Sequence, residues 1–170
     1  MTTLVLDFQG FKDKDNDNGF VIKELAVASL DGSLLQHWFV QSPFPYKWLN
    51  EAKRKECDWI TEHYHGISWK DGDVTLRQLS HRLAPILKGA EVFVKGAQKK
   101  RFVEERFSPK SVTDLDYYPS LKIMQSTTRC AFHAKTSGTM CALDNVFKIV
   151  YHNNQLWYWN SYAGCYNYHH

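Results

Sequence analysis

The first forty-odd residues contain apolar runs that partly alternate with polar positions, with the period of two that is typical of β-strands. The runs are LVLDFQGF, FVIKELAVASL and LLQHWFVQS, and the polar segments DKDNDNG and DGS separate them. Polar, glycine-containing segments between such runs indicate turns. This part of the chain therefore predicts a meander of three antiparallel strands.

Beyond residue 45 the apolar spacing changes to three or four residues, the period of a helix with one buried face. A first helix is predicted over residues 46–65, where Trp48, Cys57 and Trp59 are among the apolar positions, and a second over residues 75–87. Pro85 should end or bend the last turn of the second helix.

The second half of the chain predicts alternating strands and helices. The segments are, in order, the buried strand EVFVKG, the basic helix QKKRFVEERF, the extended segment SVTDLDYYPSL and the closing helix CALDNVFKIVYH. Three antiparallel strands followed by this alternation predict an α/β fold, with a mixed central sheet and helices on its faces.

Length and composition indicate how many domains the chain can form and whether it crosses a membrane. With 170 residues, 44% of them hydrophobic, the chain can bury one substantial core. We expect one domain over residues 1–150 and an aromatic, almost uncharged tail over residues 151–170, which packs on the domain, forms dimer contacts or offers a stacking surface. No apolar run approaches the roughly 20 residues of a membrane span, and the N-terminus lacks a signal-peptide pattern. An intracellular protein, cytoplasmic or nuclear and without a membrane partner, is therefore expected.

Charge and cysteine content narrow the chemistry only slightly. A net charge of +3 permits a polyanionic partner without requiring one. For an unsecreted chain, cysteines are expected as free thiols or metal ligands rather than disulfides. The cysteines are Cys57, Cys130, Cys141 and Cys165.

The order of elements, with an acidic residue in the first strand and a last helix opening on CALDN, resembles the ribonuclease H-like fold of the DEDDh 3′-5′ exonucleases. Those enzymes hold two metal ions on four carboxylates, and a histidine activates water. Carried onto this chain, the pair in the first strand is Asp7 and Gln9, and the histidine and aspartate of the last helix are Met140 and Asn145. Paired divalent cations need several carboxylates, so no catalytic residue is expected at these degenerate positions.

Two nearby features do not repair this loss. Asp144 is one residue early and would project about 100° away on a helix. After the fourth predicted strand, KGAQKKRF contains no carboxylate.

The segment before the last helix predicts a different metal site. Cys130, His133 and Cys141 bring two thiolates and an imidazole together, which are the donors that zinc prefers. The pattern is similar to that of the Maelstrom domain, a ribonuclease H-like module of RNA silencing with a Glu-Cys-His-Cys zinc site. That resemblance implies Glu24 as the fourth ligand of a structural zinc ion. The alternatives are that His63 or His65 replaces Glu24, or that the thiols are core residues and His133 is a hydrogen-bonded side chain.

Glu24 also belongs to a pattern that is similar to a calcium loop. Asp13, Asp15, Asp17 and Glu24 fall at the first, third, fifth and twelfth positions of an EF-hand. Asn18 stands where that loop needs glycine, and both flanks predict strands. A polar hairpin turn is therefore the preferred interpretation.

Basic residues supply a candidate nucleic-acid surface. Two clusters are expected, one at the rim of the predicted exonuclease cleft and one on the first helix: Lys95, Lys99, Lys100 and Arg101, and Lys53, Arg54 and Lys55. Basic side chains beside aromatic ones suit single-stranded nucleic acid. The alternative is a solvated helix face, because glutamates interleave with these charges.

Together these patterns predict a catalytically inactive, zinc-stabilised, exonuclease-like module. Its expected partner is single-stranded RNA, another nucleic acid or a protein, in RNA silencing or in a mobile-element or viral setting. One alternative is a ribonuclease with a non-standard active site, and another is a scaffold that binds only protein.

Overall fold

The structure is a computed structural model that describes residues 2–15, 19–124, 130–133 and 140–166, with side chains described as far as residue 155. Its centre is a five-stranded sheet with the strand order β3-β2-β1-β4-β5. The strands are β1 (Thr3–Lys12), β2 (Phe20–Ser29), β3 (Leu35–Phe39), β4 (Glu91–Val94) and β5 (Ser111–Asp114).

The sheet is mixed, as the sequence predicts. β1 pairs antiparallel with β2, and β2 pairs antiparallel with β3. β4 pairs parallel with β1, and β5 pairs parallel with β4. Parallel neighbours need a crossover connection, and α3 supplies it between β4 and β5. The α/β class and the antiparallel meander followed by further strands are therefore confirmed.

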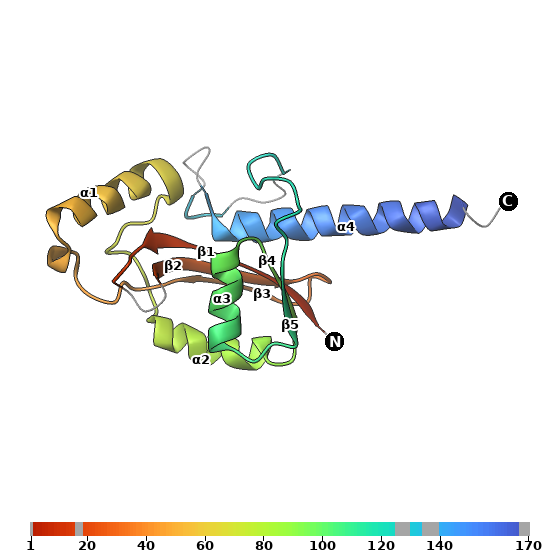
Figure 1. Cartoon of the computed structure of the whole chain (residues 1–170), viewed down its shortest axis with the longest axis horizontal. Helices are drawn as coiled ribbons and strands as arrows, with labels where there is room; N and C mark the ends of the chain where they lie inside the picture. The colour runs from red at the N-terminus through yellow and green to blue at the C-terminus, as the bar shows by residue number, and fades with distance from the viewer. Residues whose placement is uncertain (1, 16–18, 125–129, 134–139, 167–170) are drawn as a thin grey trace.

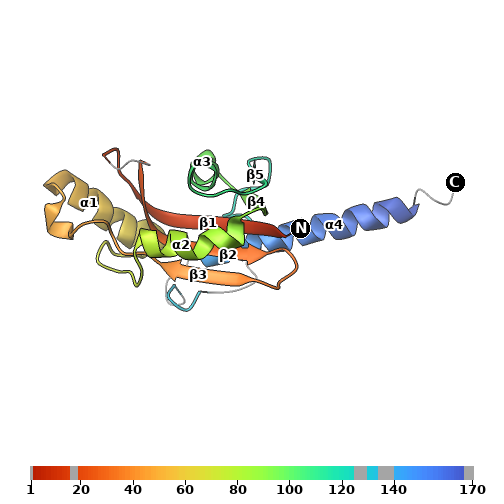
Figure 2. The same ribbon diagram turned by 90° about the horizontal axis from the view of Figure 1, so that it is seen from below.

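The helices cover both faces of this sheet (Figure 1). They are α1 (Glu51–Ile60), α2 (Leu76–Leu87), α3 (Ala97–Arg106) and α4 (Ala142–Tyr166). Apolar side chains of α2 and α3 share one core with the sheet, and α4 shares another. Figure 2 shows α1 set apart at one end of the sheet, where it packs mainly on a small separate core.

β1 is buried on both faces. Its side chains alternate between the core shared with α2 and α3 and the core shared with α4. Leu4, Leu6 and Phe8 pack with α2 and α3, whereas Val5 packs with α4. Because side chains alternate along a strand, Asp7 is directed to the α4 side with Val5. Two polar groups, Asp7 and Glu24 of β2, are thus buried where the sheet meets α4.

The first predicted helix, over residues 46–65, is wrong as a single element. A 3-10 turn occupies Tyr46–Trp48, and α1 begins only after Asn50, whose side chain accepts the Lys53 N–H at 2.8 Å. Such a side-chain cap starts a helix at its own position. After α1 the chain forms one π-helical turn, Thr61–His65, which Gly66 ends at a φ of 71°.

The second predicted helix is confirmed with its beginning one residue later. Thr75 caps α2, and its side chain and that of Gln78 bond reciprocally to each other's backbone N–H. Pro85 lies in the last turn, and the helix ends at Leu87. The helix thus ends in the turn that contains Pro85, although the Lys88 N–H still donates to the Ala84 oxygen at 3.1 Å across the proline.

The closing helix is longer than predicted. α4 has 25 residues and continues to Tyr166, and Figure 1 shows it extending well beyond the sheet. The backbone of the predicted tail is therefore helical to residue 166, while the side chain of Cys165 and residues 167–170 lie outside the described part. The role of the tail stays a prediction. None of the helices in the described part of the chain combines enough length with enough apolar character for a membrane crossing.

Candidate metal centre

Glu24 is placed by the pairing of the central strands. In β2 it lies opposite Gln9 of β1 and Phe39 of β3. It shares a face of the strand with Ala26 and Ala28, which pack under α4. The side chain is fully buried. A buried carboxylate is costly unless hydrogen bonds or cations compensate it.

Three groups surround the Glu24 carboxylate. The Ala142 N–H, at the first turn of α4, donates to Oε1 at 2.6 Å. The Nε2 atom of His37 lies 2.8 Å from Oε2, and the Cys141 thiol donates to the same oxygen at 3.5 Å. A helix N-terminus stabilises a negative charge, but within the described residues no Lys or Arg forms an ion pair with Glu24.

The four predicted zinc ligands lie together in the structure. Glu24, Cys130, His133 and Cys141 are all buried, and one ligand atom from each lies within 4.8 Å of the others. They come from three separate segments: β2, residues 130–133 and the start of α4. The prediction that these residues form one group is confirmed, and this group could hold a metal ion.

His133 is oriented for a ligand. Its Nε2 lies 2.6 Å from the backbone oxygen of His65, and because a carbonyl only accepts, Nε2 carries the proton and donates. Nδ1 then presents a lone pair, which is buried without a hydrogen-bond partner and lies 3.9 Å from Glu24 Oε2. Metal-binding histidines usually donate their second ring N–H to a carbonyl or carboxylate in this way.

The protonation of the Cys141 thiol depends strongly on its surroundings. Burial raises the pKa of the Cys141 thiol well above its ordinary value, and the nearby Glu24 carboxylate and Cys130 raise it further. A bound divalent cation reverses this preference, because its charge stabilises the thiolate. The unpartnered Nδ1, the two thiols and the carboxylate are consistent with zinc, which four such protein donors bind as a closed site.

Neither alternative histidine belongs to this group. His63 is exposed, and its Nδ1 bonds to the Trp59 backbone oxygen at 3.0 Å. The buried His65 ring uses Nε2 on the Gly10 oxygen and Nδ1 on the Ile67 N–H, both at 3.0 Å. Burial lowers the pKa of His65 to about 4. The alternative that either histidine replaces Glu24 is wrong, because the group of close donors contains Glu24 and neither His63 nor His65.

The calcium-loop pattern forms a turn instead. The Asp15 N–H donates to Asp13 Oδ1 at 3.1 Å, and the Asp13 N–H donates to the Gly19 oxygen at 3.0 Å. Glu24 lies inside β2 and is directed to the metal centre, away from this turn. Asp17 and Asn18 lie outside the described residues.

Asp7 forms a second buried centre on the neighbouring strand. Its Oδ1 lies 2.5 Å from Lys99 Nζ, and its Oδ2 accepts hydrogen bonds from Asn145 Nδ2 at 3.0 Å and Gln9 Nε2 at 3.3 Å. Three of the degenerate positions, Asp7, Gln9 and Asn145, are thus in contact. Asp144, the carboxylate next to Asn145 in sequence, pairs instead with Lys148 at 3.3 Å.

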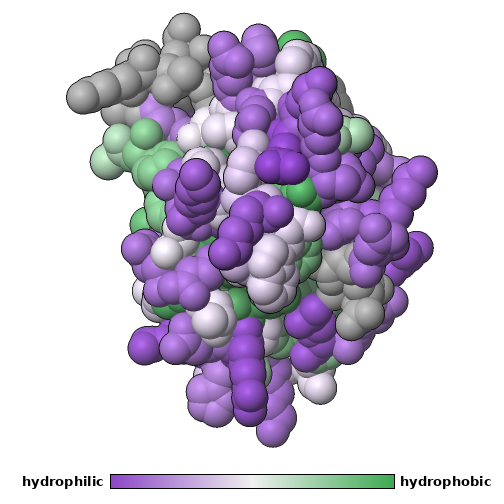
Figure 3. Space-filling view, turned by 90° about the vertical axis from the view of Figure 1, so that its left-hand side faces the viewer, coloured by the Kyte–Doolittle hydropathy of each residue, from purple (hydrophilic) through white to green (hydrophobic). Residues whose placement is uncertain are grey.

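Several residues of the predicted basic surface have internal partners. Lys99 pairs with Asp7, and Lys95 Nζ donates to the Leu115 and Tyr118 oxygens at 3.4 and 3.2 Å. Lys53 bonds to the Lys12 backbone oxygen and to Glu56, and Lys55 pairs with Glu51 at 3.3 Å. Figure 3 shows a mostly hydrophilic face with small hydrophobic patches at this end of the molecule. Nucleic-acid binding by these residues, by Arg54, and by Lys100 and Arg101 of α3 stays a prediction.

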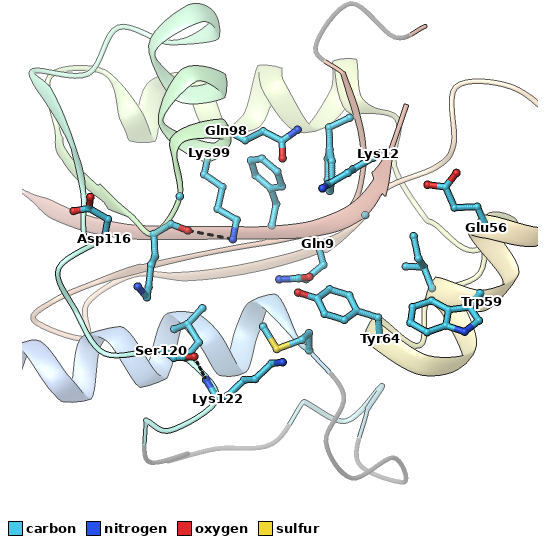
Figure 4. Close-up of a pocket in the computed structure, with 18 residues that line it drawn as sticks. Gln9, Lys12, Glu56, Trp59, Tyr64, Gln98, Lys99, Asp116, Ser120 and Lys122 are labelled. Carbon is cyan, nitrogen blue, oxygen red and sulfur yellow. Dashed lines mark hydrogen bonds between the residues drawn. The ribbon is translucent and has the colours of Figure 1, made fainter. Parts of the chain in front are cut away.

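A cleft of about 870 Å³ opens beside the Asp7 centre (Figure 4). The end of β1, the end of α1 with its π-helical turn, the start of α3 and residues 116–122 line it, together with Met140. Trp59 and Tyr64 are part of this lining and are 59% and 42% exposed. Neither was predicted as a site residue, because the apolar spacing of Trp59 indicates a core position and no pattern in the sequence places Tyr64 at a cleft.

The sequence matches no protein-family model, and no curated protein matches it. The centre has four buried donors from three segments that could hold one metal ion. Beside it lies a second buried carboxylate, Asp7, that is paired with the Lys99 ammonium.

Proposed function

We propose that this protein is a zinc-stabilised, catalytically inactive module of ribonuclease H-like design that binds single-stranded nucleic acid. The observation that carries the proposal is the buried group of Glu24, Cys130, His133 and Cys141. The strand order β3-β2-β1-β4-β5, with the first three strands antiparallel, supports the ribonuclease H-like assignment. The resemblance of the donor set to the Maelstrom domain suggests RNA silencing, a mobile element or a virus as its setting.

A structural role for the metal follows from the number and origin of the donors. Catalytic zinc keeps one coordination position open, whereas structural zinc is closed by four protein ligands. Here four donors are available, and they join β2, residues 130–133 and the start of α4. A zinc ion at this point would hold the segment before α4 against the sheet.

The loss of hydrolysis follows from the charge at Asp7. A two-metal mechanism holds cations about 4 Å apart and needs several carboxylates to do so. Asp7 is in contact with one ammonium group and two amides, Lys99, Gln9 and Asn145. The carboxylate is thus already neutralised, and the neighbouring positions add no negative charge.

The test combines zinc analysis with an RNA assay on the full chain. We expect about one zinc per chain, and retention of labelled single-stranded RNA without cleavage in buffer that contains Mg²⁺ or Mn²⁺ or neither. Metal-dependent cleavage that Asp7→Ala abolishes would instead establish a ribonuclease with a non-standard site. A zinc-loaded protein that retains no RNA even at low salt, where phosphate contacts are strongest, would contradict nucleic-acid binding and indicate a protein-binding scaffold.

A further inference from the structure

The Asp7 centre is open on one side to the cleft. Lys99 lines the cleft, its side chain is 17% exposed, and its Nζ lies 5.8 Å from the centre of the Phe8 ring. The same nitrogen lies 2.5 Å from the fully buried Asp7 carboxylate. The ammonium group therefore has a carboxylate behind it and the cleft in front of it.

We infer that the cleft is a metal-independent binding site for a short segment of single-stranded nucleic acid, in which the Lys99 ammonium contacts a phosphate. This inference rests on the proposed function and adds the site, the contacts and the absence of a metal requirement. A divalent cation bridges carboxylate and phosphate oxygens in phosphate chemistry. Lys99 is placed to do the same by charge: its ammonium group forms an ion pair with Asp7 and donates to the Lys95 backbone oxygen at 3.5 Å. One of its three N–H groups can still be directed to a phosphate.

The charges around the cleft favour an anionic ligand. Lysines at positions 12, 95, 99 and 122 line it, against the carboxylates of Glu56 and Asp116. Glu56 already lies 3.4 Å from Lys53, and Asp7 balances Lys99. Among the described residues no carboxylate pairs with Lys12 or Lys122. Phosphate groups are the complement of such a surplus of lysine charge.

Aromatic rings at one end of the cleft suit bases rather than bare phosphate. Figure 4 shows Trp59 and Tyr64 together at this end and Asp116 at the other, with Lys99 between them. The Trp59 indole is stacked on the His63 ring, with centroids 4.8 Å apart and an interplanar angle of 22°. Exposed aromatic rings beside a basic groove bind single strands by stacking on successive bases.

The volume of the cleft limits the length of the bound segment. About 870 Å³ lies within the range of ligand-sized pockets, so only a short segment of the strand fits in it. Such a site holds unpaired bases, because a paired base cannot reach a protein ring for stacking without leaving its partner.

The test measures the affinity of zinc-loaded protein for a fluorescent single-stranded RNA oligomer by anisotropy, in buffer depleted of free divalent cations and again with millimolar Mg²⁺. We expect the two dissociation constants to agree within about twofold. Trp59→Ala should weaken binding by about tenfold to a hundredfold, and Tyr64→Ala should act in the same direction. Trp48→Ala, which removes an exposed tryptophan outside the cleft, is the matched control and should have no effect.

The double variant Asp7→Asn with Lys99→Met isolates the Lys99 contact. It removes one positive and one negative charge, so the net charge is unchanged and the buried carboxylate is not left alone. We expect at least about a tenfold loss of affinity. Lys122→Ala should weaken binding and lower its salt dependence, whereas Lys88→Ala, an exposed lysine away from the cleft, should do neither.

The outcomes distinguish a failure of the cleft site from a failure of the proposed function. Binding that Mg²⁺ strengthens tenfold or more, or that is indifferent to Trp59→Ala and to the double variant, overturns the cleft site while the zinc-stabilised nucleic-acid module remains. A zinc-loaded protein that binds no single strand, or that binds only a protein, overturns both.

Discussion

The two buried carboxylates, Asp7 and Glu24, lie on adjacent strands, and both contact α4, yet their surroundings differ in kind. Asp7 is paired with the Lys99 ammonium and accepts from two amides. Glu24 is in contact with a helix N–H, a thiol and an imidazole. Asp7 thus has an internal cation, whereas the Glu24 group provides donors for an external one.

This difference teaches that a buried carboxylate does not by itself indicate a catalytic metal. Moving an ion into the protein interior costs several kcal/mol unless close partners compensate it. A lysine, two amides or a metal ion can each supply that compensation. The partners delivered by α3 and α4 therefore decide which of these chemistries a carboxylate takes part in.

The largest effect is expected when one thiolate is removed from the Glu24 group. Cys130→Ser should abolish stoichiometric zinc and lower the free energy of unfolding by more than about 4 kcal/mol, because loss of a structural metal is among the largest single-residue effects. Metal analysis and urea denaturation measure the two results. Cys57→Ser, at a buried cysteine outside the group, should retain zinc. A purified wild-type protein without zinc would refute this side of the comparison.

The second largest effect is expected when the Lys99 ammonium, the internal cation of the Asp7 centre, is removed. Lys99→Met leaves a buried carboxylate without its counter-charge and should cost about 3–5 kcal/mol of unfolding free energy. Adding Asp7→Asn to this variant should recover most of the loss, since no buried charge then remains. Denaturation of the wild type, both single variants and the double variant gives the coupling, and additive effects would contradict the pair. Zinc content should be unchanged throughout.

His65 is a buried group that links β1 to the Glu24 group: its ring bonds to the Gly10 backbone oxygen, and its own backbone oxygen accepts from His133. Burial lowers its pKa from 6.5 to about 4. Between these values the unfolded chain binds a proton here that the folded protein does not, so stability falls as pH falls through this window. The total effect is about 3 kcal/mol. NMR titration of the imidazole nitrogens measures the pKa, and a midpoint near 6.5 would contradict this assignment.

The smallest expected effect concerns His37, the imidazole partner of Glu24. His37 lies 2.8 Å from Glu24 Oε2, and residues that orient a metal ligand change affinity by about 10- to 100-fold when they are removed. His37→Ala should weaken zinc by this factor in competition with a chromophoric chelator. His81→Ala, at an exposed histidine of α2, is the control. Equal zinc affinity in both variants would assign His37 no role at the centre.

Much of the fold and of the candidate metal centre could be predicted, because both depend on local patterns in the sequence. Alternation in the first strands and helical spacing after them are consequences of burial on one face, and they predict the mixed α/β sheet. Cys130, His133 and Cys141 are close in sequence, so their donor chemistry is visible as a motif. Glu24 is far from them, and only a resemblance implied it.

The exposure of Trp59 could not be predicted in the same way. Apolar spacing places it with Cys57 on one helix face, but α1 stands at the end of the sheet and buries Cys57 in a small core while Trp59 faces the cleft. Periodicity tells which residues share a face, not whether another element covers it. The partner of Lys99 was missed for a related reason, since a basic run on a helix predicts solvent contact.

What the chain alone determines is the inventory: a soft donor triad, the Asp7 carboxylate in the first strand, and uncharged side chains at Gln9, Met140 and Asn145. Which charge meets which partner is a property of the folded molecule. Asp7 and Asn145 are 138 residues apart in sequence and 3.0 Å apart in space, and Glu24 meets the first turn of α4 across 118 residues. Electrostatic energies depend on separation in space and on burial, so the same inventory yields a neutralised carboxylate at one strand and a candidate zinc centre at the next.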